Sequence, residues 1–206
     1  DIYKYKLRTS FDWELYEKPI TYHNNNGVYT TSGLVSIPTL LNSGSFIEYD
    51  TYYDTMWVAN YNNVDATIIT IYDQSDYTIL NTISIPFTIS YMLYDYTNNK
   101  MYIISDASSN LYVTNTQNYT IENVIPLGIT PLFMIIDSLT NYLYVLCIDS
   151  SEIIIIDISN DYLPIHTLAV GDLPYRMSID KVSRLLYVSC QASDNVHIID
   201  LNFFTT

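Results

Sequence analysis

The sequence predicts an all-β protein built from repeated four-stranded units. Residues that suit a pleated surface are abundant, with 22 Tyr among the 206 residues alongside many Ile, Val and Thr. An aromatic-rich strand pattern recurs at nearly constant spacing, and a turn signal precedes each copy. Hydrophobic residues make up 49% of the chain and charged residues 15%, so the chain can bury an apolar core.

The recurring strand is read as MWVAN, MYIIS, LYVLC and LYVSC at 56–60, 101–105, 143–147 and 186–190. Its aromatic members lie 45, 42 and 43 residues apart and are Trp57, Tyr102, Tyr144 and Tyr187. An aspartate precedes each copy, at Asp50, Asp95, Asp137 and Asp180. A proline opens each unit, at Pro38, Pro86, Pro131 and Pro174. We therefore expect one tight turn before every aromatic strand.

Two further strands follow in each unit. A second apolar strand is predicted at 67–73, 110–116, 152–158 and 195–201, and a closing strand at 78–85, 120–128 and 165–171. Each unit then holds four short strands, A to D, as a β-propeller blade does. The alternative, a β-sandwich, gives no reason for one strand pattern to recur at nearly constant spacing.

The units resemble the YVTN-repeat family of β-propellers over about residues 38–201. LYVTN stands at 111–115, although on the third strand of its unit, where the family has it on the second; LYVLC and LYVSC are closer to that second strand. LAVGDLP at 168–174 and IPLGITP at 125–131 are similar to the end of the family's fourth strand. The resemblance implies a propeller, often seven-bladed, from a prokaryotic and especially an archaeal cell surface.

We expect residues 1–206 to form a single propeller domain. The predicted full blades are 38–85, 86–130 and 131–173, with a partial last blade at 174–206 and an atypical N-terminal blade within 1–37. In that N-terminal part we expect a strand at 11–17 and a hairpin of 20–24 with 28–37 through Asn26-Gly27, while 2–7 completes the last blade. This predicts five blades; a segment of a larger propeller and a four-bladed ring with an N-terminal arm remain open alternatives.

The charge balance excludes two classes of partner. The formal net charge is −14, and the first 18 residues hold equal numbers of acids and bases, so the rest of the chain carries all of it. Such a body repels phosphate, so we expect no nucleic-acid binding and no attraction to anionic membranes. No apolar run reaches the roughly 18 residues that span a bilayer, so no membrane insertion is predicted. Because the chain opens at Asp1 with no apolar leader, we expect a mature form or a piece of a longer protein.

Residues of the types used in catalysis and metal binding are scattered. Cys147 and Cys190 occupy matching positions of neighbouring units and are predicted to be two buried thiols that form no disulfide. His23, His166 and His197 lack metal-ligand spacing. The recurring aspartates, and a second series at Asp73, Asp157 and Asp200, are interpreted as turn formers and not as a cation site. We therefore predict no catalytic residue, no metal and no cofactor.

The tyrosines supply the candidate binding surface. Those of the recurring strand are expected to pack between sheets, whereas others lie beside predicted turns, where stiff amphipathic rings favour binding. This candidate surface consists of Tyr52, Tyr53, Tyr61, Tyr94, Tyr96 and Tyr142. Asn118-Tyr119-Thr120 is a single glycosylation acceptor triplet and points to an extracellular location.

These observations predict a non-enzymatic propeller that mediates assembly or attachment. We expect it on an extracellular surface, as a cell-envelope protein or as a virion component of the capsid or tail. Its expected partners are other protein subunits of that assembly, with cell-surface glycans as a further option. The alternative is a metal-dependent propeller enzyme of the lyase or lactonase type, for which Glu48 and Arg176 are the main polar residues on the predicted first strands.

Overall fold

The computed structural model describes residues 2–7, 13–18, 29–31, 34–36, 44–62 and 66–203, with side chains at 46–60 and 66–203. Within these ranges every regular element is a β-strand, apart from one short 3-10 turn at Leu201–Phe203. The all-β prediction is therefore confirmed for the described residues. No helix in this part of the chain has the length and apolar character needed to cross a membrane.

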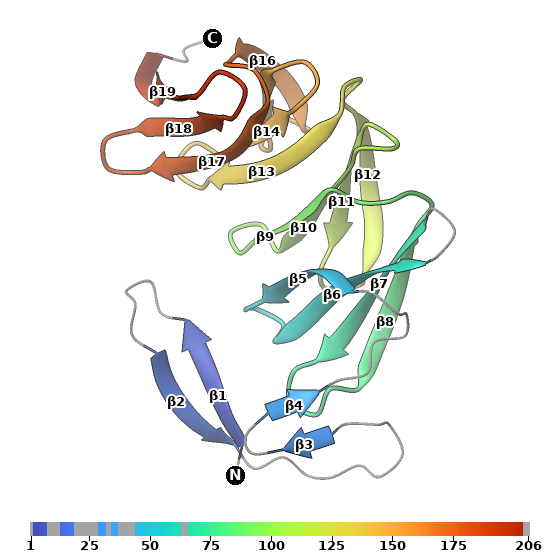
Figure 1. Cartoon of the computed structure of the whole chain (residues 1–206). Coiled ribbons are helices and arrows are strands. Elements are labelled where there is room, and N and C mark those ends of the chain that lie inside the picture. The colour runs from blue at the N-terminus through green and yellow to red at the C-terminus, as the bar shows by residue number, and fades with distance from the viewer. Residues whose placement is uncertain are drawn as a thin grey trace.

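Four antiparallel sheets follow one another along an arc (Figure 1). The first blade contains β5 (Gly44–Asp50), β6 (Thr55–Asn62), β7 (Ala66–Asp73) and β8 (Ile79–Ile85). The second contains β9 (Tyr91–Asp95), β10 (Lys100–Ser105), β11 (Asn110–Asn115) and β12 (Thr120–Pro126). The third contains β13 (Pro131–Asp137), β14 (Tyr142–Cys147), β15 (Glu152–Asp157) and β16 (Leu163–Ala169). The fourth contains β17 (Pro174–Asp180), β18 (Leu185–Cys190) and β19 (Asn195–Asp200).

The middle strands are apolar without interruption because both faces of an inner blade are covered. In β15 the run Ile153–Ile156 is buried at every residue, although alternate side chains point to opposite faces of the sheet. The outer strand β12 instead alternates half-buried and exposed residues, as expected for a strand that faces water on one side.

Three apolar clusters join consecutive blades. One forms between the first and second blades around Trp57 and Met92, one between the second and third around Tyr102 and Met134, and one between the third and fourth around Tyr144 and Met177. The first strands β5, β9, β13 and β17 contact one another in that order. The core of the protein is therefore a series of interfaces between blades.

The turn between the first two strands of every blade ends in a left-handed residue. These residues have φ angles of 57°, 52°, 58° and 59° and are Asp54, Asn99, Asn141 and Arg184. Asp and Asn tolerate this conformation because their short side chains bond locally, whereas Arg gains no such compensation. Arg184 is the basic residue among these four.

The N-terminal strands pair differently from the prediction. β1 (Ile2–Leu7) pairs with β2 (Trp13–Lys18), while the β17–β19 sheet has three strands in the described residues, so 2–7 does not complete that blade. Pairing β1 with β2, its neighbour in the sequence, closes a short loop and costs less entropy than pairing β1 with the distant last blade. β3 (Tyr29–Thr31) and β4 (Leu34–Ser36) form a hairpin where 28–37 was predicted as one strand, with a turn-forming Ser-Gly dipeptide between them.

Part of the N-terminal prediction lies outside the described residues. This concerns 20–28, which hold His23 and the Asn26-Gly27 pair, and the unit-opening Pro38. The number of blades and the limits of the domain stay predictions.

Candidate binding surface

The recurring aspartates form the turns that the sequence predicts. Oδ1 of Asp50 accepts the backbone N–H groups of Tyr52 (2.8 Å) and Tyr53 (3.1 Å), and Oδ1 of Asp95 accepts that of Thr97 (2.9 Å). Asp137 and Asp180 bond their own turns in the same way. The second series repeats this geometry at the end of the third strands: Asp73, Asp157 and Asp200 accept from the residue two positions on. Both series are therefore turn formers, as predicted.

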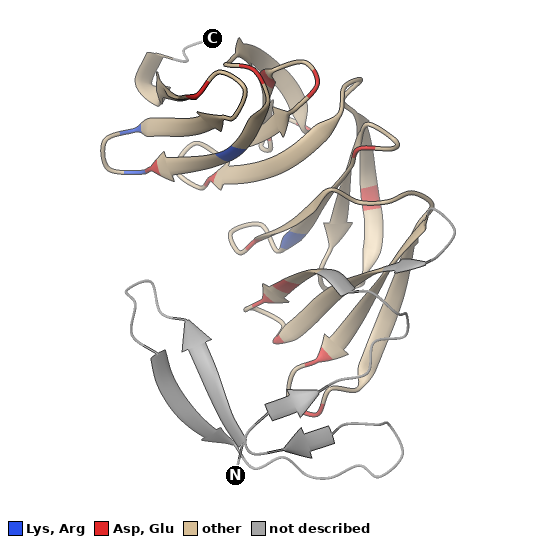
Figure 2. Ribbon diagram, viewed as in Figure 1, with Lys and Arg blue, Asp and Glu red and all other residues tan. Residues whose placement is uncertain are grey.

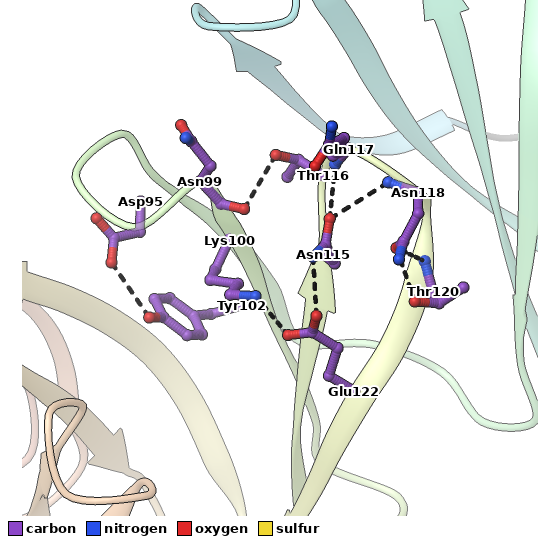
Figure 3. Close-up of polar contacts among 10 residues, drawn as sticks. All are labelled: Asp95, Asn99, Lys100, Tyr102, Asn115, Thr116, Gln117, Asn118, Thr120 and Glu122. Atoms are coloured by element: carbon purple, nitrogen blue, oxygen red, sulfur yellow. Dashed lines mark hydrogen bonds and ion pairs between the residues drawn. The ribbon is translucent and has the colours of Figure 1, made fainter.

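The second blade shows a turn that the aspartate pattern missed. Asn115 takes the place of the aspartate at the end of β11, and its Oδ1 accepts the backbone N–H of Gln117 at 2.8 Å (Figure 3). Its Nδ2 donates to Glu122, which also pairs with Lys100. The amide is isosteric with a carboxylate, so a search for Asx residues at this position would have found all four blades.

Two of the predicted surface tyrosines are well exposed on consecutive turns. Tyr52 in the β5–β6 turn is 67% exposed, and Tyr96 in the β9–β10 turn is 59% exposed. Tyr53 is half-buried and packs edge-on against Tyr52, with ring centroids 4.7 Å apart. The hydroxyl of Tyr96 donates to the Ser138 hydroxyl in the β13–β14 turn of the next blade (3.3 Å). The same Ser138 hydroxyl also accepts a hydrogen bond from Lys181. The structure thus presents a row of turns with two exposed rings.

The other predicted surface residues lie elsewhere. Tyr94 lies within β9 and is only 9% exposed; its ring packs in the cluster between the first and second blades. Burial and the nearby Asp50 carboxylate raise the pKa of Tyr94, and its hydroxyl donates to Oδ1 of Asn99 at 3.2 Å. Tyr142 is a half-buried residue of β14, and the side chain of Tyr61 on β6 lies outside the described residues. The prediction put Tyr94 on the surface because it lies next to the turn aspartate. The alternation of side chains along β9 instead directs it into the interface between blades.

A row of side chains along the first strands was not predicted from the sequence. Four residues before each turn aspartate stand Phe46, Tyr91, Phe133 and Arg176. The ring centroids of Phe46 and Tyr91 are 6.0 Å apart, those of Tyr91 and Phe133 are 4.6 Å apart, and the Arg176 guanidinium lies 5.1 Å from the Phe133 centroid. Aligning the units on their turn aspartates would have revealed this row, which continues from blade to blade.

Glu48 on β5 is the acidic residue of these first strands whose pKa is raised. Burial raises the pKa of its carboxyl to about 7, and the backbone hydrogen bonds of Tyr49 and Tyr94 oppose that rise. A carboxyl with this pKa can exchange a proton near neutral pH. Among the described residues no group of three His, Cys, Asp or Glu is arranged to hold a metal ion.

Both cysteines are buried free thiols, as predicted. Each thiol lies 3.7 Å from the carbonyl oxygen two residues earlier, of Val145 and Val188 respectively. Burial raises the pKa of Cys147 to about 12, so this thiol is unreactive in the folded protein. His166 lies on β16 and His197, half-buried, on β19, the strands on which they were predicted.

Acidic residues dominate the charged positions of the described blades (Figure 2). They lie mostly at turns and strand ends, where the aspartate series places them. Basic positions are few, and two of them, Lys181 and Arg184, lie at the β17–β18 turn.

Comparisons with known proteins connect this chain to solved structures only. No family model matches the sequence, and no curated protein matches it. The dihydro-heme d1 dehydrogenase NirN matches with a TM-score of 0.64 at 14% identity, over 77% of this chain and 34% of that one. A protein of unknown function from Desulfotomaculum acetoxidans has a TM-score of 0.64 at 12% identity, over 81% and 57% of the two chains. Hydrazine synthase from Kuenenia stuttgartiensis has a TM-score of 0.62 at 14% identity, over 75% and 57%.

This chain thus spans between a third and three fifths of the length of these structures. Identities this low relate folds and not activities. Together with the repeated antiparallel sheets, the matches show that this chain has the β-propeller fold.

Proposed function

We propose that this chain is a non-enzymatic β-propeller module of the YVTN-repeat type that mediates assembly or attachment on an extracellular surface or a virion. The observation that carries the proposal is the pair of exposed rings, Tyr52 and Tyr96, on consecutive turns of adjoining blades. Both turns are held by buried aspartates, so the rings are presented from a rigid base. Rigid aromatic anchors lose little conformational entropy on binding.

The surrounding charge supports a particular class of partner. The body is strongly acidic, so a neutral glycan or a protein surface with basic residues fits these turns, and an anionic polymer does not. Within the proposal, subunits of a cell envelope, capsid or tail are the first class of partner, and neutral cell-surface glycans are the second.

Co-sedimentation of the purified chain with envelope or virion particles from its source tests this function. The double variant Tyr52→Ser, Tyr96→Ser should lose most of the bound fraction while its unfolding transition is unchanged, because both side chains are exposed. Val124→Ser, which removes a 51% exposed apolar side chain from the outer strand β12, is the matched control and should bind normally. Equal binding by the double variant and the control would refute the role of these turns.

A metal-dependent propeller enzyme of the lyase or lactonase type is the second candidate. Glu48 favours it, because its carboxyl has a pKa of about 7 on a first strand beside an aromatic row that ends in Arg176. Isothermal titration with Mn²⁺, Ca²⁺ and Zn²⁺ distinguishes the two candidates. Stoichiometric binding that Glu48→Gln abolishes would support the enzyme, whereas the assembly module requires no such binding.

A further inference from the structure

The three interfaces between blades use the same positions of the repeat. We call the face of a blade that packs on the next blade in sequence its forward face. It carries the aromatic residue of the second strand, the residue two positions later, and two residues of the third strand. In the first three blades these side chains are at most 1% exposed: Trp57, Ala59, Ile69 and Ile71; Tyr102, Ile104, Leu111 and Val113; Tyr144, Leu146, Ile153 and Ile155.

The forward face of the fourth blade carries the same kind of side chains but leaves them open. Tyr187 is half-buried and Ser189 is exposed, while Val196 and Ile198 are 57% and 62% exposed. Val196 and Ile198 stand where Ile153 and Ile155, both 0% exposed, stand in the third blade. Apolar residues of a repeat are exposed here where every earlier blade buries them.

The turn aspartates show the same contrast. Asp50, Asp95 and Asp137 are at most 1% exposed, and Arg184 of the following blade lies 2.6 Å from Asp137. Asp180 is exposed and bonds residues of its own turn, namely the backbone N–H groups of Val182 (2.9 Å) and Ser183 (3.3 Å) and the Ser183 hydroxyl (2.7 Å). Its carboxylate is therefore placed to receive a residue such as Arg184 from a following blade.

A groove and an open strand edge complete this face. The groove has a volume of about 790 Å³ and lies beside Ser189 and Val196, which are paired across β18 and β19, with Tyr175 at its border. Among the strands that the structure describes, none pairs with the outer edge of β19, whereas β8, β12 and β16 cover that edge in the other blades. This uncovered edge has unpaired backbone groups and can pair with a fourth strand of the same blade.

The side chains that an occupant of this face needs can be inferred from those that the next blade contributes to each of the three existing interfaces. There the next blade contributes apolar side chains from its first two strands: Met92, Met101 and Ile103; Met134, Leu143 and Val145; Met177, Leu186 and Val188. A sheet that matches the fourth forward face therefore carries Met, Leu, Ile or Val at these positions. By analogy with the Arg184–Asp137 pair, it also carries a basic residue at the left-handed turn position.

A second copy of this chain does not fit. On the corresponding side of its first blade, Val58, Thr70 and Tyr72 are buried, at 4%, 0% and 1% exposed, but Ile47 at the position of Met92 is 67% exposed and Met56 at the position of Met101 is half-buried. Charge, rather than burial, is what opposes a second copy. Asp54 occupies the turn position that Arg184 holds in the fourth blade, so it would bring a second acid against Asp180.

We propose that the forward face of the β17–β19 sheet docks a further propeller blade supplied from outside residues 1–206. The docked blade covers Tyr187, Val196 and Ile198 and directs an Arg or Lys from its first turn to Asp180. This inference is independent of the tyrosine surface, because it concerns the completion of the propeller and not the attachment of the propeller to a surface.

Photo-crosslinking in the native host tests the proposal. p-Benzoylphenylalanine at the position of Ile198 should yield crosslinked peptides that come from outside residues 1–206 and carry the repeat, with a turn aspartate followed by an aromatic strand. The same probe at Val124, on the outer strand β12, is the control and should yield none of these peptides. Asp180→Lys should lower the yield about tenfold through repulsion of the docked cation, whereas Asp172→Lys should leave it unchanged.

Each other result overturns the proposal. Crosslinks to residues 1–43 of the same chain would assign the face to the N-terminal segment. A crosslinked dimer of this chain would assign it to a second copy. Peptides without the repeat, or a yield equal to that of the Val124 control, would show that no blade docks there.

Discussion

Arg184 of the fourth blade lies with its Nη1 2.6 Å from Oδ2 of Asp137 in the third blade, so an ion pair crosses the boundary between the blades. The Asp137 side chain is 0% exposed and that of Arg184 is 18% exposed. Nη1 has no acceptor with hydrogen-bond geometry, so the contact is electrostatic in character. The same residue holds a left-handed backbone conformation, with φ of 59°.

Removing this guanidinium should destabilise the protein. Arg184→Asn keeps a residue that tolerates the left-handed conformation, as Asn99 and Asn141 do in the other blades, but leaves the buried Asp137 carboxylate without its cation. We expect a loss of about 2 to 4 kcal/mol in the free energy of unfolding, measured by urea denaturation. Lys181→Ala, which removes an exposed cation from the same turn, should change it by less than about 0.5 kcal/mol. Similar values for the two variants would refute a structural role for the pair.

The repeated aromatic position should differ in its importance along the chain. Tyr144→Ala empties a site that is 1% exposed between the third and fourth blades, so it should cost about 3 to 5 kcal/mol of unfolding free energy. Tyr187 occupies the same position in the fourth blade, where no further blade in the described part of the chain covers it and its side chain is only half-buried. Tyr187→Ala should therefore cost only about 1 kcal/mol of unfolding free energy. Equal costs in chemical denaturation would show that the fourth forward face is covered in the isolated chain.

Glu48 should make the stability depend on pH. Because the folded pKa is about 7 and the ordinary value is 4.5, the folded state favours the neutral carboxyl. The resulting stability is fully present below about pH 4.5 and is lost as the pH rises to about 7. Over this window the loss should be about 2 to 3 kcal/mol, and Glu48→Gln should remove that component of the pH profile. A variant whose profile parallels that of the wild type between pH 4.5 and 7 would contradict this assignment.

The two thiols should react only after unfolding. Cys147 and Cys190 are both buried and free, so a thiol reagent at pH 8 should label neither in the native protein and both in denaturant without reductant. Mass spectrometry of the labelled chain measures this directly. Rapid labelling of Cys190 alone would show that the fourth blade opens locally.

The strands of the four blades were predictable because their pattern is local and repeated. Turn aspartates and the aromatic strand mark each unit, and the structure places strands at those residues. The tyrosine surface was only partly predictable, since proximity to a turn does not show whether a ring such as that of Tyr94 points into an interface. The pairing of β1 with β2 was not predictable, because the residue pattern of β1 suits the edge of β2 and the edge of the last blade equally well. The Arg184–Asp137 pair joins residues from different units, which no single repeat reveals.

Each apolar cluster is shared by two consecutive blades, and every junction is built from the same positions. Any one blade can therefore pack on any other through the same set of positions. Loss of residues 131–173 by an in-frame deletion would bring Tyr102, Leu111 and Val113 against Met177, Leu186 and Val188, and Asp95 against Arg184, which is a junction of the existing kind. A gene for such a protein can therefore gain or lose one unit and still encode junctions of the existing kind.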